Sequence, residues 1–178
     1  MKKVKMKNIL VRMLIGLFVV FAAAMYSGET KVNAYVFNGY KLTNPRDVKI
    51  YLGYNTSGYN IMTYAKKWQT YCPQVKIKNL KTKRNANIWV MGSPKVNNGT
   101  YAITYHNSNN VHGVVLYKDF YNAGVGIRNE TIVHEIGHAL GLAHTQSSKN
   151  SKSVMRATGF NNNAKPLSDD RAGIKKLY

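Results

Sequence analysis

Five short segments of the chain carry the hydrophobic pattern of β-strands. Residues 46–52 alternate polar and apolar positions, as expected for a strand with one buried face, and residues 75–78 alternate in the same way. Residues 86–91 contain a continuous apolar run that is typical of a buried strand. Residues 100–105 and 113–117 are two more segments rich in β-forming residues, separated by a polar loop.

Three further segments place apolar residues at helical spacing. Residues 61–71 have this pattern and end before Pro73, which disfavours a helical conformation in the residue before it. Residues 131–140 form a second predicted helix, and residues 169–177 form a third. The order strand, helix, four strands, helix, loop, helix predicts an α+β fold.

The N-terminus has the pattern of an export signal. Residues 1–7 are basic, residues 13–25 are apolar throughout, and Ala34 ends a stretch of compact residues that a signal peptidase can read. The sequence therefore predicts a signal peptide at 1–34 and a secreted, extracellular domain at 35–178. An uncleaved signal that anchors the protein in a membrane is the alternative.

The chain is strongly basic, with a formal net charge of +19. Residues 35–178 retain 20 Lys and Arg against 6 Asp and Glu. Such a charge attracts polyanions, so association with an anionic cell wall or cell surface is one expectation, and a high charge without a specific partner is the other. The chain has no nucleic-acid-binding motif, so no nucleic-acid partner is expected. Cys72 is the single cysteine and is predicted to be a small buried residue near a helix end.

Most of the candidate metal-binding and catalytic residues lie in residues 131–144, TIVHEIGHALGLAH. His134 and His138 are four residues apart, so on a helix both imidazoles project from one face and can hold one ion. Gly141 stands where the helix should end, and glycine tolerates the left-handed backbone that lets the chain reverse. His144 can then supply a third nitrogen, which leaves the fourth position of a zinc ion open to water, as in catalytic sites.

Glu135 is predicted to be the catalytic base. It follows His134 directly, and about 100° of helical rotation places it beside the ion rather than on it. From there it can take a proton from a zinc-activated water. Imidazole ligands without a thiolate suit zinc better than calcium or magnesium. A helix with unrelated histidines and a non-catalytic metal site are the alternatives for this segment.

The segment HEIGHALGLAH resembles the zinc-binding helix of the metzincin metalloproteases, and its surroundings are most similar to the matrixin branch. Residues 153–155, Ser-Val-Met, resemble the Met-turn of that family, which implies that Met155 lies beneath the zinc. Residues 167–178 resemble the matrixin C-terminal helix, with the paired Asp169 and Asp170 and a terminal Leu-Tyr.

The resemblance implies a zinc-dependent endopeptidase that acts on protein or peptide substrates with one catalytic zinc ion. It also implies a mixed five-stranded sheet with three helices, among them the active-site helix and the C-terminal helix. Substrate would lie extended along an edge strand, which the order of elements assigns to residues 100–105. The implied substrate-binding residues are Thr100, Tyr101, Ala102, Ile103 and, from the loop after the Met-turn, Phe160.

Some features depart from the family. Animal matrixins bind a structural zinc and calcium through acidic loops, whereas residues 86–129 hold Asp119 as their sole acidic residue. Calcium is thus an alternative that the count of acidic residues does not support. His106 and His112 are expected to be solvated or core histidines, with structural-zinc ligands as the alternative. Two other functions stay open: a cationic cell-surface binding protein with a non-catalytic zinc site, and a zinc amidase acting on cell-wall peptide. A monomer is expected.

Overall fold

Residues 35–108 and 110–178 are described here by a computed structural model of the chain. The predicted signal peptide, residues 1–34, lies outside the described residues. Within the described ranges, none of the helices combines the length and the apolar character needed to cross a bilayer.

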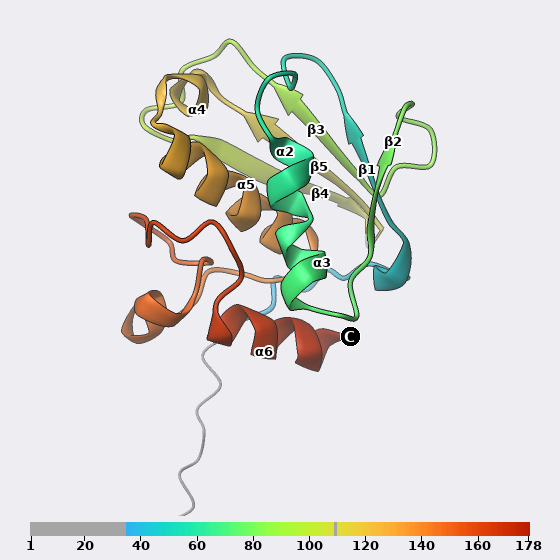
Figure 1. Cartoon of the computed structure of the whole chain (residues 1–178), viewed down its shortest axis with the longest axis vertical. Helices are drawn as coiled ribbons and strands as arrows, with labels where there is room; N and C mark the ends of the chain where they lie inside the picture. The colour runs from blue at the N-terminus through green and yellow to red at the C-terminus, as the bar shows by residue number, and fades with distance from the viewer. Residues whose placement is uncertain (1–34, 109) are drawn as a thin grey trace, which may run out of the picture. The chain divides into compact units, whose positions relative to one another are not determined.

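The described residues contain one five-stranded mixed sheet with the strand order β2-β1-β3-β5-β4. All neighbouring strands run parallel except β4, which is antiparallel to β5 and lies at one edge (Figure 1). All five predicted strands are therefore confirmed, including the edge position of the segment around 100–105. The strands are β1 (Val48–Leu52), β2 (Ile77–Leu80), β3 (Ile88–Gly92), β4 (Ala102–Ser108) and β5 (Val111–Leu116).

The expectation of three helices is wrong, because the described residues form five α-helices. The predicted helix at 61–71 is interrupted at Lys66, whose ψ of −8° departs from the value of about −42° of a regular α-helix. The single turn around Phe120 is too short for a helical period to show in the sequence. The helices are α2 (Ile61–Ala65), α3 (Lys67–Tyr71), α4 (Lys118–Asn122), α5 (Val125–Ala139) and α6 (Ser168–Leu177), with 3-10 turns η1 (Pro45–Asp47) and η2 (Ser147–Lys152).

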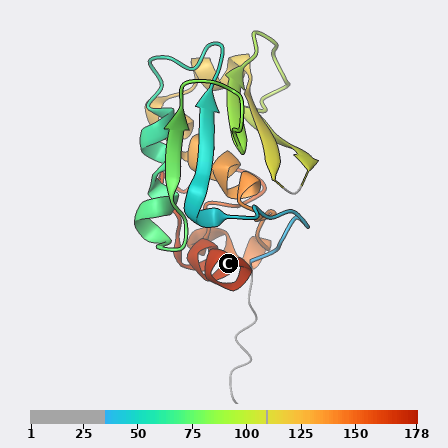
Figure 2. The ribbon, with the colours of Figure 1, turned by 90° about the vertical axis from the view of Figure 1, so that its right-hand side faces the viewer.

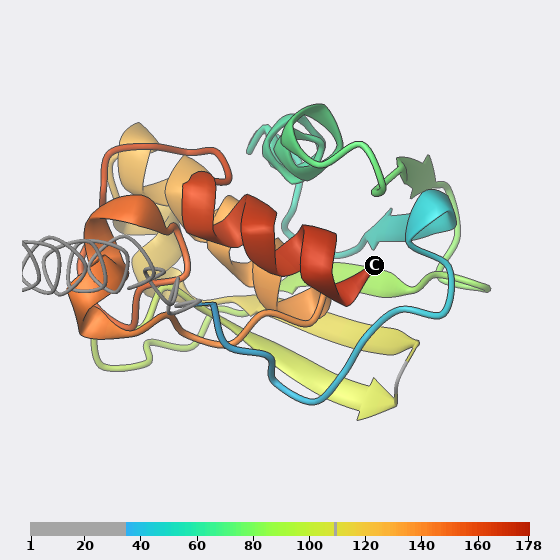
Figure 3. The ribbon, with the colours of Figure 1, turned by 90° about the horizontal axis from the view of Figure 1, so that it is seen from below.

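Helices α2, α3 and α5 cover one face of the sheet, and no helix of the described residues covers the other face, which is called the open face (Figure 2). Side chains of β1 alternate accordingly: Val48 and Ile50 are fully buried towards the helices, whereas Lys49 points away. Seen from below, α6 lies across the end of the molecule next to α5 (Figure 3). Cys72 is buried at the end of α3, as predicted, and burial raises the pKa of its thiol to about 12, so it is a neutral core residue.

Helix α5 approaches its neighbours closely at Gly137. A Cβ atom at this position would lie 2.3 Å from Met155 Sδ and 2.8 Å from Trp68 Cζ2. Trp68 is fixed there, because its indole Nε1 donates a hydrogen bond of 2.9 Å to the backbone oxygen of Val133. Only glycine therefore lets the helix pack directly on the Met-turn and on α3.

His112 of β5 is fully buried and pairs with His106 of β4. The Asn38 amide donates to His106 Nε2 at 3.2 Å, so His106 carries its proton on Nδ1 and donates to His112 Nδ1 at 3.0 Å. The proton on His112 then lies at Nε2, which has no hydrogen-bond partner among the described residues. This chain of bonds makes both histidines parts of the fold, in agreement with the prediction for core histidines.

We expect Gly137→Ala to lower the free energy of unfolding by about 1–3 kcal/mol, because the added methyl group overpacks the contact with Trp68 and Met155. This loss should exceed the gain of up to about 1 kcal/mol that alanine brings to a helix. Gly126→Ala is the matched control, since a Cβ there would meet nothing within 4 Å in the same helix. Urea unfolding should show a lower free energy of unfolding for Gly137→Ala and a higher one for Gly126→Ala. An equal increase in both variants would contradict the packing argument.

Acid should destabilise the fold through His112. Burial, and secondly the charge of His106, lower the pKa of His112 to about 4, whereas an unfolded histidine titrates near about 6.5. Below pH ~6.5 the unfolded chain therefore binds a proton at His112 that the folded chain does not bind. The free energy of unfolding falls as the pH is lowered towards about 4. The full effect for one such group is up to about 3 kcal/mol. In urea unfolding with a chelator, the free energy of unfolding of His112→Gln should depend less on pH than that of the parent. The same pH dependence in the variant and the parent would contradict this role of His112.

Candidate metal centre

Three imidazoles converge beside helix α5. The ring centroids of His134 and His138 are 4.6 Å apart, and those of His138 and His144 are 4.8 Å apart. One ligand atom from each of the three residues lies within 4.8 Å of the others. His134 and His138 lie one turn apart on α5, and His144 comes from the loop that follows. The structure thus brings the three predicted ligands to one point.

Backbone carbonyls fix the protonation of two of these rings. His134 Nδ1 lies 2.8 Å from the oxygen of Val154, and His138 Nδ1 lies 2.7 Å from the oxygen of Leu142. A carbonyl oxygen can only accept, so both Nδ1 atoms carry the proton and both Nε2 atoms present a lone pair.

The two Nε2 lone pairs face each other at 3.0 Å, an arrangement that is repulsive unless a cation lies between them. Zn–N bonds of about 2.0–2.1 Å suit nitrogens at this separation. Burial lowers the pKa of both His134 and His138 to about 4, which keeps them in the neutral form that binds a metal. The donor set therefore fits zinc.

A reversal of the chain after α5 brings His144 back to the other ligands. Gly141 adopts a φ of +107°, and a Cβ atom there would lie 2.4 Å from the backbone oxygen of Tyr40. Asn38 stabilises the same chain reversal, because its amide nitrogen donates hydrogen bonds to the backbone oxygens of His138 at 2.8 Å and Leu142 at 3.3 Å. Sequence analysis missed Asn38, since nothing in its own neighbourhood indicates contact with residues about 100 positions away.

The Met-turn lies directly under the ligands and is held by α6. Met155 is 2% exposed and packs against Gly137. Asp170 accepts hydrogen bonds from Ser153 Oγ at 2.5 Å and from the backbone nitrogen of Val154 at 2.8 Å. Because the oxygen of Val154 is the partner of His134, the Asp170 carboxylate orients a metal ligand through one residue.

Glu135 is 6% exposed and points to the edge strand. Thr104 Oγ1 of β4 lies 2.6 Å from Glu135 Oε2 and 3.0 Å from the Glu135 backbone oxygen. Burial raises the pKa of Glu135, while the nearby His138 and the bond to Thr104 oppose the rise. Sequence analysis placed Thr104 within the edge strand at 100–105 but did not assign it a role, because its inward direction depends on the strand register.

The ligands line a cleft of about 620 Å³ between β4 and the loop after the Met-turn. Tyr101 and Phe160 face each other in it, with ring centroids 5.5 Å apart at 74°. Glu130 also lines the cleft, and its carboxylate accepts hydrogen bonds from the backbone nitrogens of Asn161 and Asn163 at 2.7 and 3.0 Å. All five residues predicted to bind substrate line this cleft, and their contact with substrate stays a prediction: Thr100, Tyr101, Ala102, Ile103 and Phe160.

Comparison with solved structures finds the same fold in distant proteins. Two structures of myroilysin have TM-scores of 0.60 and 0.58 at 15% and 16% identity. They match 81% and 79% of this chain and 98% and 86% of their own. A chain of the ECX AB5 holotoxin in its GM1-bound form has a TM-score of 0.60 at 12% identity, over 82% of this chain and 84% of that one.

The sequence itself assigns the family. No curated protein sequence is close enough to count as a match. The family profile described as matrixin matches residues 50–178, a range that begins in β1 and includes the three histidines, the Met-turn and α6. This match covers well over half of the chain and agrees with the fold and with the ligand geometry. The chain belongs to the matrixin family.

Proposed function

We propose that the protein is a zinc-dependent endopeptidase in which His134, His138 and His144 hold the metal and Glu135 is the general base. The observation that carries the proposal is the pair of facing Nε2 lone pairs, with a third imidazole beside them and a buried carboxylate on the same helix. Membership of a family of zinc metalloproteases supports it.

The arrangement of this chain's residues suits peptide hydrolysis. A zinc ion held by the three imidazoles would lower the pKa of water and polarise a carbonyl group. Glu135 lies beside the ligands, and its raised pKa suits a group that accepts a proton and then passes it to the leaving amine. Thr104 keeps the carboxylate directed to this position.

The substrate that fits this cleft is an extended peptide. Among the described residues strand β4 pairs only with β5, so the backbone groups along its other side can pair with an added strand. The strand runs along the cleft from Ala102, and Tyr101 and Phe160 offer aromatic walls for a substrate side chain. We therefore assign substrate binding to Thr100, Tyr101, Ala102, Ile103 and Phe160.

We also propose that the protein is exported and that cleavage before Tyr35 releases the domain at 35–178. The basic start, the apolar run and the compact residues that precede Tyr35 support this proposal. N-terminal sequencing of protein recovered from the culture medium tests it; an N-terminus still within residues 1–25 would contradict it.

We expect Glu135→Gln to retain zinc and to lose activity by several orders of magnitude, because the amide keeps the shape of the side chain but cannot take a proton. The measurement is cleavage of casein with sequencing of the products, with and without a chelator, together with elemental analysis for zinc. Cleavage by the variant at the parental rate would contradict the role of Glu135. Failure of the parent to cut any unfolded protein would favour a binding protein instead.

The matched control for metal binding is His144→Ala. Because it removes one of three ligands, it should lose zinc as well as activity, whereas Glu135→Gln loses activity alone. Equal zinc content in both variants would show that His144 is not a ligand.

We expect Thr104→Val to lower kcat about 10–100-fold with little change in KM or zinc content, because valine keeps the volume but releases the Glu135 carboxylate. Thr104→Ser restores the hydroxyl and should recover most of kcat. A purely structural role would instead show the same loss for both variants, and an unchanged kcat in Thr104→Val would refute a positioning role.

A further inference from the structure

The face of the sheet that the helices leave open carries a group of lysines at the β1–β2 edge. Lys49 of β1 and Lys78 of β2 are register partners, so their side chains stand next to each other on the same face. Lys76 is two residues before Lys78 and is exposed, so strand alternation places it on this face as well. Lys83, in the turn that leads to β3, is also exposed. These four residues are called the lysine face.

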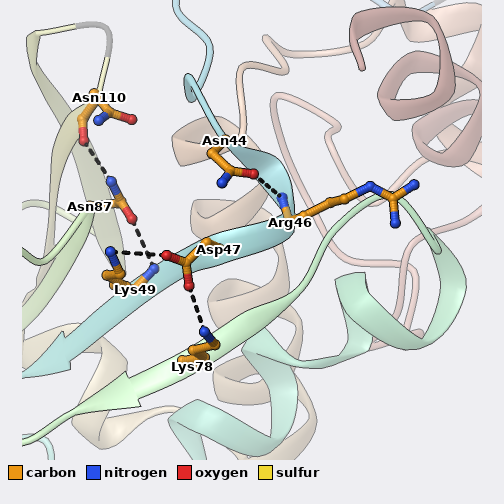
Figure 4. A network of polar contacts seen from close by, with 7 residues as sticks. All are labelled: Asn44, Arg46, Asp47, Lys49, Lys78, Asn87 and Asn110. Carbon is orange, nitrogen blue, oxygen red and sulfur yellow. Dashed lines mark hydrogen bonds and ion pairs between the residues drawn. The ribbon is translucent and has the colours of Figure 1, made fainter.

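A single carboxylate organises the lysine face. Asp47 contacts Lys49 Nζ at 3.0 Å and Lys78 Nζ at 2.8 Å (Figure 4). Hydrogen bonds from Lys78 and then Lys49 lower the pKa of Asp47, so it is ionised whenever the lysines are charged. The side chain of Lys78 is still 64% exposed, so this contact holds the ammonium group over the sheet without removing it from solvent.

The charge of this region is almost entirely of one sign. Between residues 48 and 118 the chain has ten Lys and Arg residues and no Asp or Glu. Asp47 is thus the sole acidic residue from 35 to 118 and cannot neutralise the lysine face. Lys49 and Lys78 are about 5 Å apart across the strands, and Lys76 and Lys78 are about 7 Å apart along the chain. With Lys83, these cations of like charge favour a partner with repeated negative charges.

Aromatic rings continue the open face towards β4. One row across the sheet joins Leu80, Tyr51, Trp89, Gly113 and Tyr105. The Trp89 ring fills the space over Gly113, where a Cβ atom would lie 2.4 Å from the ring, and Lys83 Nζ lies over the same ring at 4.4 Å from its centroid. Tyr105 is 45% exposed at the end of the row.

The contacts of the Trp89 ring favour an acidic polysaccharide over single-stranded nucleic acid as the partner. Single-stranded nucleic acid is bound by stacking its bases on open aromatic faces. The Trp89 ring packs on Gly113, and the ammonium group of Lys83 lies over the ring. Trp89 therefore has no free ring face on which a base could stack. The half-buried Tyr51 beside it can contact the apolar side of a sugar while the lysines bind acidic groups.

We propose that the lysine face binds an acidic polysaccharide, a sugar polymer with regularly repeated carboxylate, sulfate or phosphate groups. The face lies on the side of the sheet opposite to the metal centre, because Thr104, which contacts Glu135, points inward from β4, whereas the neighbouring Tyr105 points outward. A bound polymer therefore leaves the cleft free. The inference does not depend on the proposed peptidase activity, since binding is measured without any cleavage.

The test compares two variants that remove the same charge. One carries Lys76→Gln, Lys78→Gln and Lys83→Gln on the lysine face; the control carries Lys152→Gln, Lys175→Gln and Lys176→Gln, three exposed lysines outside it. Binding to dextran sulfate is measured as a function of salt, with uncharged dextran as the blank. The first variant should bind about tenfold or more weakly at low salt, and the slope of log K against log salt should fall by about two to three.

Three outcomes would overturn the proposal. Equal losses in the two variants would show that net charge alone attracts polyanions. Parental affinity in the lysine-face variant would show that dextran sulfate binds elsewhere. Tighter binding to poly(U) RNA than to dextran sulfate would point to nucleic acid. Both variants should unfold at the parental temperature and cleave a short uncharged peptide at the parental rate. Absence of peptide cleavage in the parent as well would contradict the proposed peptidase activity without affecting the binding result.

Discussion

Two backbone carbonyls that fix the imidazoles of His134 and His138 are the constraint on which the rest of this structure depends. Each accepts a hydrogen bond from Nδ1–H, so each ring must present the Nε2 lone pair to the same point. The carbonyl of Val154 is placed by Asp170 of α6, and that of Leu142 follows the reversal at Gly141. The C-terminal helix, the Met-turn and the end of α5 therefore form one assembly around the ligands.

The sheet contributes the second half of the site. Its edge strand β4 brings the Thr104 hydroxyl to the Glu135 carboxylate, so the orientation of this carboxylate depends on the register between β4 and β5. A one-residue slip of that register would turn Thr104 outward and Tyr105 inward. The close packing of α5 at Gly137 limits the helix to one position over the Met-turn. The carboxylate is thus held between two rigid elements rather than by a loop.

The two faces of the sheet have different chemistry. The inner face is apolar and carries the helices and the metal centre, and the open face carries lysines and aromatic rings. The three solved structures compared above share 12–16% identity with this chain, so this fold can form from very different sequences. The open face is a region where the surface charge can vary without affecting the cleft.

The sequence alone determined the five strands, the ligand triad and the position of Glu135, because strand alternation and the spacing of His134, His138 and His144 are local properties of the chain. It did not determine the number of helices, since neither the break at Lys66 nor the five-residue helix α4 around Phe120 has a helical period long enough to be recognised in the sequence. Only the tertiary structure brought Thr104 to Glu135 and Asn38 to the end of α5, because those contacts join segments about 30 and 100 residues apart. Which of the chain's many lysines gather on one surface was likewise decided by strand register and by the face that the helices leave open.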